Sequence, residues 1–310
     1  MEEKLEIMNL LQNKQLLENE LKSLAYGSVE IRENESNKYI YVHYREDGVA
    51  LTKYVGEYSN ELYNLVLNNS IKAKELKKQM REINKKLKQL NYIEEDLSEK
   101  VEQNIDFAKR HLVDTIYKQA ILEGVATTFA DTESIIEGGK VNNMTSEDIM
   151  KIVNLKHAWE FILNKNVILS NTNFTLLCEI NKMVEEGFYY SAGKVRNVPV
   201  TIGGTTWKPN LPIESVIKEE LEKIFNDEMD DIDRAIELLL YTMKKQVFID
   251  GNKRTSVIFC NHYLISKGKG IISIPAELTA KFKDLLISYY EGKDEKQIKK
   301  FIKEKCYMGI

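Results

Sequence analysis

Apolar residues recur at helical spacing in the first part of the chain. Within residues 1–25 they fall on one stripe, formed by Leu10, Leu17, Leu21 and Leu24. Over residues 60–90 a second stripe advances in steps of three and four, as the seam of a coiled coil does: Ala73, Leu76, Met80, Ile83, Leu87 and Leu90. The pattern predicts two long helices, with lysines on the other faces of the second.

The residues between these helices alternate instead. Residues 39–58 are rich in β-branched and aromatic side chains and contain Asp47-Gly48, a strong signal for a hairpin turn. We therefore expect residues 1–95 to form an antiparallel helical module that carries a short β-hairpin. The seam can close within one chain or between two, so a homodimer stays open.

The rest of the chain, residues 96–310, returns to helical periodicity. Helices are expected over residues 99–124, 146–163, 173–186, 213–225 and 229–247, with a short one that ends at Glu137. Residues 195–208 alternate around Gly203-Gly204 and predict a second β-hairpin. The expected fold class is therefore all-α, with a small β-hairpin and the helical N-terminal module.

Composition narrows the classes of function. The 310 residues carry a formal net charge of −4, which argues against a general nucleic-acid binder. No apolar run approaches the roughly 18 residues that cross a bilayer, and the acidic N-terminus lacks the features of a signal peptide. Three widely spaced cysteines suggest free thiols in a reducing compartment. We expect a cytoplasmic protein without a membrane partner.

The stretch KKQVFIDGNKRTSVIF, residues 244–259, carries the chemistry. It predicts helix, tight loop and helix, with Lys253 and Arg254 in the first turn of the second helix. Cations there face the positive end of the helix dipole, and a bound phosphate would resolve the repulsion. The amides of Gly251 and Asn252 would grip that phosphate, and Asp250 would hold Mg²⁺. The alternative is that Asp250 or Asn252 only caps the helix and the cations reach solvent.

These residues resemble a known family. FIDGNKR, residues 248–254, is similar to the Fic/Doc motif H-x-F-x-[DE]-G-N-[GK]-R-x-x-R, and the resemblance covers residues 100–310, with a core over 150–272. It implies a helical fold and transfer of a nucleotide fragment, most often AMP from ATP, onto a hydroxyl of a target protein. By this resemblance Asp250 binds the metal and Arg254 the outer phosphates. The hairpin tip would be a flap that receives the target segment as an added strand, through Ile202, Gly203, Gly204 and Thr205.

Three residues depart from the motif of the AMP-transferring members, which have glycine at the place of Lys253. Gln246 stands where the family has its general base, and an amide cannot accept a proton near neutral pH. Lys253 resembles the Doc branch, of toxin–antitoxin type, whose members act as kinases. Val257 replaces the last arginine, so that grip on the γ-phosphate is missing or is supplied by Lys253.

No other residue replaces the base convincingly. His262 lies eight residues beyond Arg254, about 12 Å along the helix. His157 is better read as a core or interfacial histidine, and Lys244 and Lys245 would have to lose their charge.

A built-in brake is also suggested. TESIIEGG, residues 132–139, resembles the inhibitory helix [ST]-x-x-x-E-[GN] of some Fic proteins, which would let Glu137 pair with Arg254 or Lys253. An ordinary helix end is the equal alternative.

Three hypotheses follow. The first is a Fic/Doc-type transferase that moves AMP or a phosphoryl group from ATP to an unidentified target protein. The second is a silent nucleotide sensor that acts through its N-terminal module. The third, which the charge disfavours, makes residues 1–95 a docking arm for nucleic acid or a partner.

Overall fold

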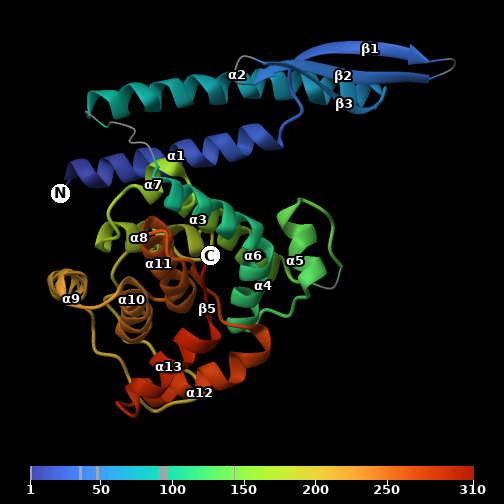
Figure 1. Cartoon of the computed structure of the whole chain (residues 1–310). Coiled ribbons are helices and arrows are strands. Elements are labelled where there is room, and N and C mark those ends of the chain that lie inside the picture. Colours follow the sequence, from blue (N-terminus) through green and yellow to red (C-terminus); the bar gives the residue numbers. More distant parts are fainter. Residues whose placement is uncertain (1, 35–36, 47–48, 91, 93–96, 143) are drawn as a thin grey trace. The chain divides into compact units, whose positions relative to one another are not determined.

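The computed structural model describes all residues except 1, 35–36, 47–48, 91, 93–96 and 143. The chain divides into two compact units, residues 1–93 and 94–310 (Figure 1). Among the described residues, none of the helices combines the length and the apolar character that crossing a bilayer requires.

The first unit consists of two helices and a three-stranded sheet. Helix α1 (Glu2–Ser23) contacts helix α2 (Asn60–Gln89), and the two run antiparallel (Figure 1). The chain between them forms an antiparallel sheet in the order β1-β2-β3, with bounds Ser28–Asn34, Asn37–Glu46 and Val49–Glu57. One face of the sheet packs on α2, because Ile40 and Val42 of β2 are fully buried with Val66.

The sheet is larger than the predicted hairpin. Strands β2 and β3 pair as far as Glu46 and Val49, and the predicted turn Asp47-Gly48 lies outside the described residues. Strand β1 was not expected, yet it pairs along β2 from Asn34 opposite Asn37 to Ser28 opposite His43. Its sequence, SVEIREN, has only two apolar residues among charged and polar ones, which is a weak strand signal.

The second unit is mostly helical. Its helices are α3 (Glu99–Arg110), α4 (Leu112–Leu122), α5 (Phe129–Ile136), α6 (Ser146–Ile162), α7 (Lys165–Ile168), α8 (Phe174–Val184), α9 (Glu214–Asn226), α10 (Asp231–Lys245), α11 (Asn252–Ser266), α12 (Thr279–Tyr290) and α13 (Glu295–Lys305). A 3₁₀ turn, Ala276–Leu278, precedes α12. Two short antiparallel strands, β4 (Ile271–Ile272) and β5 (Tyr307–Met308), pair near the chain end.

Helix α11 is the centre of this unit. It contacts α3, α6, α8 and α10, and nearly all of its residues are buried (Figure 1). Three of these neighbours, α6, α8 and α10, begin at side-chain caps that satisfy early amides, as Asn173 does for α8 and Asp230 for α10. The loop between α10 and α11 is therefore held by a rigid core.

Two elements of this unit differ from expectation. The helix predicted over residues 99–124 is interrupted at His111, whose φ of −97° and ψ of 7° separate α3 from α4. The hairpin predicted at residues 195–208 keeps its turn at Gly203-Gly204, but its arms form no β-ladder. Pro199 has no amide hydrogen, and the guanidinium of Arg196 donates to the carbonyl oxygens of Val198 and Asn210, both at 2.7 Å. Side-chain bonds therefore join the two ends of this segment in place of ladder bonds.

Candidate functional site

The loop between α10 and α11 turns through two left-handed residues. Gln246 ends α10 with φ 48° and ψ 60°, which costs a residue other than glycine on the order of 1 kcal/mol. Gly251 precedes α11 with φ 72°. A Cβ atom on Gly251 would stand 2.3 Å from Oε1 of Glu185, so both its conformation and its surroundings require glycine.

The side chain of Asn252 closes this loop. Its Nδ2 donates to the carbonyl oxygen of Phe248 at 2.8 Å, and its Oδ1 accepts from the amide of Phe248 at 2.9 Å. Phe248 is buried and anchors the loop in the core. The sequence assigned Asn252 to the phosphate cradle through its backbone amide. Its side chain has the separate role of fixing the loop conformation.

The guanidinium of Arg254 is buried among carboxylates. Its Nη2 lies 2.7 Å from Oε1 of Glu185 and 3.7 Å from Oδ1 of Asp250, and its side chain is 3% exposed. Its Nε lies 3.8 Å from Oε2 of Glu123. Within the described part of the chain, Nε and Nη1 of Arg254 have no hydrogen-bond partner. The charges of the surrounding carboxylates hold this side chain in place. Its Nε and Nη1 remain able to donate hydrogen bonds to a ligand.

Burial dominates the electrostatics of Glu185. It raises the pKa of this carboxyl to about 7, although the neighbouring Arg254 acts to lower it. The charges of Asp250 and Glu123 raise the pKa further. A carboxylate that is costly to ionise is thus held beside the arginine that can compensate it.

Lys253 shares a carboxylate with Arg254. Its Nζ lies 3.5 Å from Oε1 of Glu123, whose side chain is 14% exposed and stands at the C-terminal end of α4. The two adjacent cations of the motif therefore face the same acid. Arg254 has a second, deeper partner in Glu185, whereas Lys253 has no second acidic partner among the described residues.

Asp250 is the exposed acid of the site. Half of its side chain is accessible, and its Oδ1 accepts from the amide of Gly251 at 2.6 Å. Among the described residues no group of three or more His, Cys, Asp or Glu side chains could hold a metal ion. Mg²⁺ commonly takes one or two carboxylates and completes its shell with phosphate oxygens and water. Asp250 therefore fits a magnesium ion whose other ligands would be phosphate oxygens and water.

A cavity of about 380 Å³ opens beside these residues. Its lining comes from the motif loop, from residues 200–203 of the flap segment and from α12, and includes Glu123, Gln246, Asp250 and Lys253. The volume lies in the range of small-molecule sites. The flap segment is fixed to α12, since the Trp207 ring stacks on Tyr290 at 5.3 Å and Thr205 donates to Glu291 at 2.8 Å.

Gln246 lines this cavity without the properties of a base. Its Nε2 donates to the carbonyl oxygen of Met243 at 2.7 Å, so the amide folds back on the end of α10. Its own carbonyl oxygen accepts from Nε of Arg196 at 2.6 Å. Arg196, which the sequence analysis did not select, therefore links this position to the flap segment.

The acid that lies beside Lys253 and Arg254 is Glu123. The sequence pattern predicted that Glu137 would take this place. Glu137 caps the end of α5 and is exposed, and it forms no ion pair with Lys253 or Arg254 among the described residues. Glu123-Gly124 ends α4 with the same Glu-Gly pair that drew attention to Glu137-Gly138. This signal could have identified Glu123. Glu185 had no comparable local signal.

The two histidines considered as replacement bases lie elsewhere. His262 is fully buried, with Nδ1 2.8 Å from the hydroxyl of Thr172 and Nε2 donating to the carbonyl oxygen of Val167 at 2.9 Å. His157 is half-buried on α6, and burial lowers its pKa. Neither lines the cavity.

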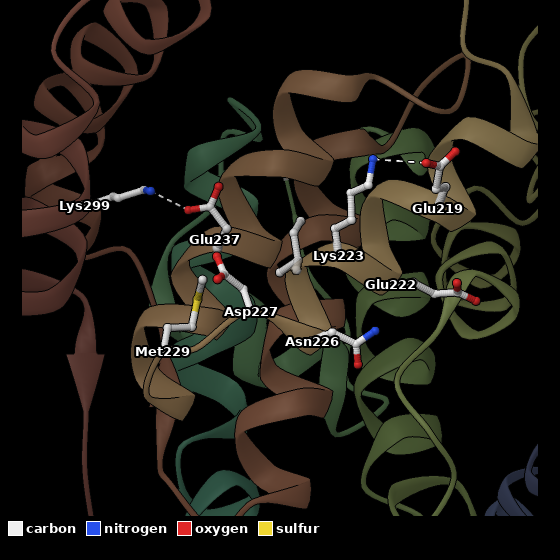
Figure 2. A pocket seen from close by; sticks show the side chains of 9 residues that line it. Glu219, Glu222, Lys223, Asn226, Asp227, Met229, Glu237 and Lys299 are labelled. Atoms are coloured by element: carbon white, nitrogen blue, oxygen red, sulfur yellow. Dashed lines mark ion pairs between the residues drawn. The ribbon is translucent and has the colours of Figure 1, made fainter.

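A larger hollow, of about 650 Å³, lies between α9, α10 and α13 (Figure 2). The two lysines of its lining are paired with acids of the same lining, Lys299 with Glu237 and Lys223 with Glu219. It holds no residue of the motif. We therefore place the candidate site in the smaller cavity, where the unsatisfied nitrogens of Arg254 stand close to its lining residues.

Known proteins resemble this chain in the sequence pattern of one region and in fold. Residues 171–264 match the model of the Fic/DOC family. The structure resembles Fic-1 (residues 134–508) from C. elegans with a TM-score of 0.53 at 17% identity, over 79% of this chain and 73% of that one. It also resembles a Fic domain containing signaling protein from Bacteroides thetaiotaomicron, with a TM-score of 0.52 at 16% identity, over 67% and 86% of the two chains.

A third solved structure, a Fic family protein from Desulfovibrio desulfuricans, has a TM-score of 0.52 at 11% identity and covers 68% of this chain and 73% of its own. No curated protein matches the chain. Likeness at these identities concerns the fold, while the family match covers the flap segment and the motif loop. The comparisons therefore show a Fic/DOC family match over residues 171–264 and a fold similar to that of solved Fic proteins.

Proposed function

We propose that this protein binds a nucleoside triphosphate and a magnesium ion at the start of α11. The observation that carries the proposal is the buried guanidinium of Arg254, whose Nε and Nη1 lack hydrogen-bond partners among the described residues. Buried donors of a charged group are costly to leave unpaired. Phosphate oxygens at a helix N-terminus would supply several strong acceptors at once.

The proposed donor is ATP, and the proposed reaction transfers AMP or a phosphoryl group to a hydroxyl of a target protein. Lys253 and Arg254 neutralise the phosphates, and the amides of Gly251 and Asn252 donate to them. The amide of Gly251 is bonded to Asp250, so that carboxylate has to turn away before the amide can donate. Magnesium held by Asp250 would neutralise charge on the phosphate oxygens.

Gln246 limits the rate of this reaction. An amide cannot take the proton of the attacking hydroxyl, and the loss of a general base typically lowers rates by about 10²- to 10⁴-fold. Phosphoryl and nucleotidyl transfer depend mainly on positioning and charge neutralisation, so a slow reaction survives.

Glu123 restrains the site further. It faces both cations, so an incoming phosphate has to displace its carboxylate from Lys253 and from Nε of Arg254. This is the inhibitory role that the sequence suggested for Glu137. A carboxylate and a phosphate that compete for the same cations shift the site between a closed and a ligand-ready state.

The flap segment is the proposed docking edge for the target. Its tip is exposed at Gly203 and Gly204, and its arms have no ladder partner among the described residues. A target segment that adds as a strand would place its hydroxyl over the cavity. The free cysteines Cys178, Cys260 and Cys306 support a cytoplasmic setting for this reaction.

The second candidate is a nucleotide sensor without chemistry that acts through residues 1–93. It is favoured by Gln246, whose amide is turned to Met243. One experiment separates the two. The protein is incubated with Mg²⁺, cell lysate and ATP labelled at the α- or the γ-phosphate.

Incorporation of α-label supports AMP transfer, and γ-label supports a kinase. Stabilisation by ATP without transfer of either label leaves the sensor. The Gln246→His variant should gain transfer if the rest of the site is assembled, and Gln246→His with Asp250→Asn is its control. Absence of any ATP-dependent stabilisation, in wild type and in Glu123→Gln alike, would refute both candidates.

A further inference from the structure

Helix α12 brings one cation to the cavity wall. Four of its residues line the cavity: Lys283, Leu286, Ile287 and Tyr290. Their spacing of three, four and seven places them on one face of the helix. Three of them are apolar or aromatic, so the first, Lys283, is a single charge on an otherwise apolar wall.

In the part of the chain that the structure describes, Lys283 has no protein partner that explains its position. Its side chain is half-buried, and among the described residues no carboxylate pairs with it. Lys281, on the same helix, is exposed and does not line the cavity. A partly buried ammonium without an acceptor is unfavourable, so the position suits a ligand that supplies acceptor atoms.

The ends of the cavity can be told apart along α12. Tyr290 stands at the motif end, because it lines the cavity with Gln246 and Glu123, and both act on its hydroxyl. Lys283 comes seven residues earlier, about 10 Å along the helix axis. Phosphates held by Lys253 and Arg254 would therefore occupy the end away from Lys283.

The wall between the two ends is suited to a flat apolar group. Leu286 and Ile287 line it from α12, and Ile202 lines it from the flap segment. The segment passes close to the helix, since a Cβ on Gly204 would lie 3.0 Å from Cδ1 of Ile287. A nucleotide with its phosphates on the motif loop would lay its base between these residues and direct the far edge of the base to Lys283.

We infer that Lys283 binds the edge of the nucleotide base and favours guanine over adenine. The inference rests on the proposed binding of a nucleoside triphosphate, and it replaces ATP with GTP as the preferred ligand of that site. An ammonium group has three donors and no acceptor. Guanine presents two adjacent acceptors, N7 and O6, whereas adenine places the N6 amino donor beside N7. Lys283 therefore gains a second bond with guanine and meets an unfavourable donor with adenine.

The test is a titration of the full chain with each ligand in the presence of Mg²⁺. Binding is measured as the rise in the temperature of thermal unfolding. The ligands are GTP, ATP and inorganic tripolyphosphate. The variants are Lys283→Met, which keeps an unbranched stem without the charge, and Lys281→Met as the matched control. We expect GTP to bind wild type roughly tenfold more tightly than ATP. Lys283→Met should abolish this preference and leave tripolyphosphate binding unchanged, and Lys281→Met should behave as wild type.

Three results overturn the inference, and they differ in what they leave standing. If wild type binds ATP as tightly as GTP, base selection fails while nucleotide binding stands. If Lys283→Met weakens tripolyphosphate binding as well, Lys283 contacts phosphates and the base assignment fails. If neither nucleotide nor tripolyphosphate binds wild type or Glu123→Gln, the proposed function falls together with the inference.

Discussion

Nη2 of Arg254 lies 2.7 Å from Oε1 of Glu185, and both side chains are almost completely buried. Glu123, which also lies near this arginine, lines the cavity, whereas Glu185 does not. The two carboxylates therefore have different parts. Glu185 anchors Arg254 from within the core, and Glu123 occupies the side on which a ligand would enter.

The first prediction concerns this entry side. Glu123→Gln should raise the affinity for tripolyphosphate or a nucleoside triphosphate about fivefold or more, because the ligand no longer competes with a carboxylate for Lys253 and Arg254. Isothermal titration measures the change. Glu137→Gln is the matched control, since Glu137 is exposed and pairs with neither cation among the described residues. An equal gain in both variants would argue against a specific brake.

The second prediction concerns the anchor. Arg254→Gln should lower the free energy of unfolding by about 3–5 kcal/mol, because it leaves Glu185 buried without its partner. Denaturant unfolding measures this loss. Restoring part of it in the double variant Arg254→Gln, Glu185→Gln would show that the uncompensated carboxylate is the cause. A double variant less stable than the single one would contradict this account.

The third prediction concerns the loop clamp. Asn252→Ala should destabilise the protein by about 2–3 kcal/mol, since it leaves the buried amide and carbonyl groups of Phe248 unpaired. Asn252→Asp keeps the acceptor for the amide of Phe248 and loses the donor to its carbonyl oxygen. It should therefore fall between wild type and Asn252→Ala in thermal unfolding. If Asn252→Ala unfolds as wild type does, the clamp does not hold the loop.

The fourth prediction concerns the stability of the fold at acidic pH. Burial lowers the pKa of His262 to about 4, so the unfolded chain binds this proton more readily than the folded one. Stability should therefore fall as the pH drops from about 6.5 to 4, by on the order of 3 kcal/mol from this residue. Unfolding at a series of pH values measures the slope.

Glu185 acts in the opposite direction over part of this range. Its pKa is raised to about 7, so the folded chain binds its proton more readily, and stability from this group declines as the pH rises from about 4.5 to 7. Glu185→Gln removes that opposing contribution. The variant should then show a steeper loss of stability on acidification, and an unchanged slope would contradict the assignment.

Local sequence signals located most helices and the motif loop. The seam of α2 has strong periodicity, and the break at residues 250–252 marks the start of α11, so both elements were placed within a few residues. The division of residues 99–124 at His111 was missed, because no proline or glycine marks it. Strand β1 was missed because only two of its residues are apolar, which is a weak strand signal.

The charged partners of the motif were the harder part. Glu123 and Glu137 both precede a glycine at a helix end, and nothing local distinguishes them. Packing of α4 brings Glu123 to Lys253, whereas α5 leaves Glu137 exposed. Glu185 and Arg196 become visible only because α8 and the flap segment meet the loop that follows α10.

By itself the sequence determined that this chain is helical, that a loop with two cations begins a buried helix, and that Gln246 cannot act as a base. These properties depend on neighbouring residues and on the chemistry of single side chains. Tertiary structure alone decided which acids compensate Arg254, how Asn252 closes the loop, and that Lys283 faces the cavity. Glu123 and Glu185 lie tens of positions or more from Arg254 in the sequence, whereas Asn252 and Phe248 are near neighbours. The energies of all these contacts depend on burial, which local periodicity does not encode.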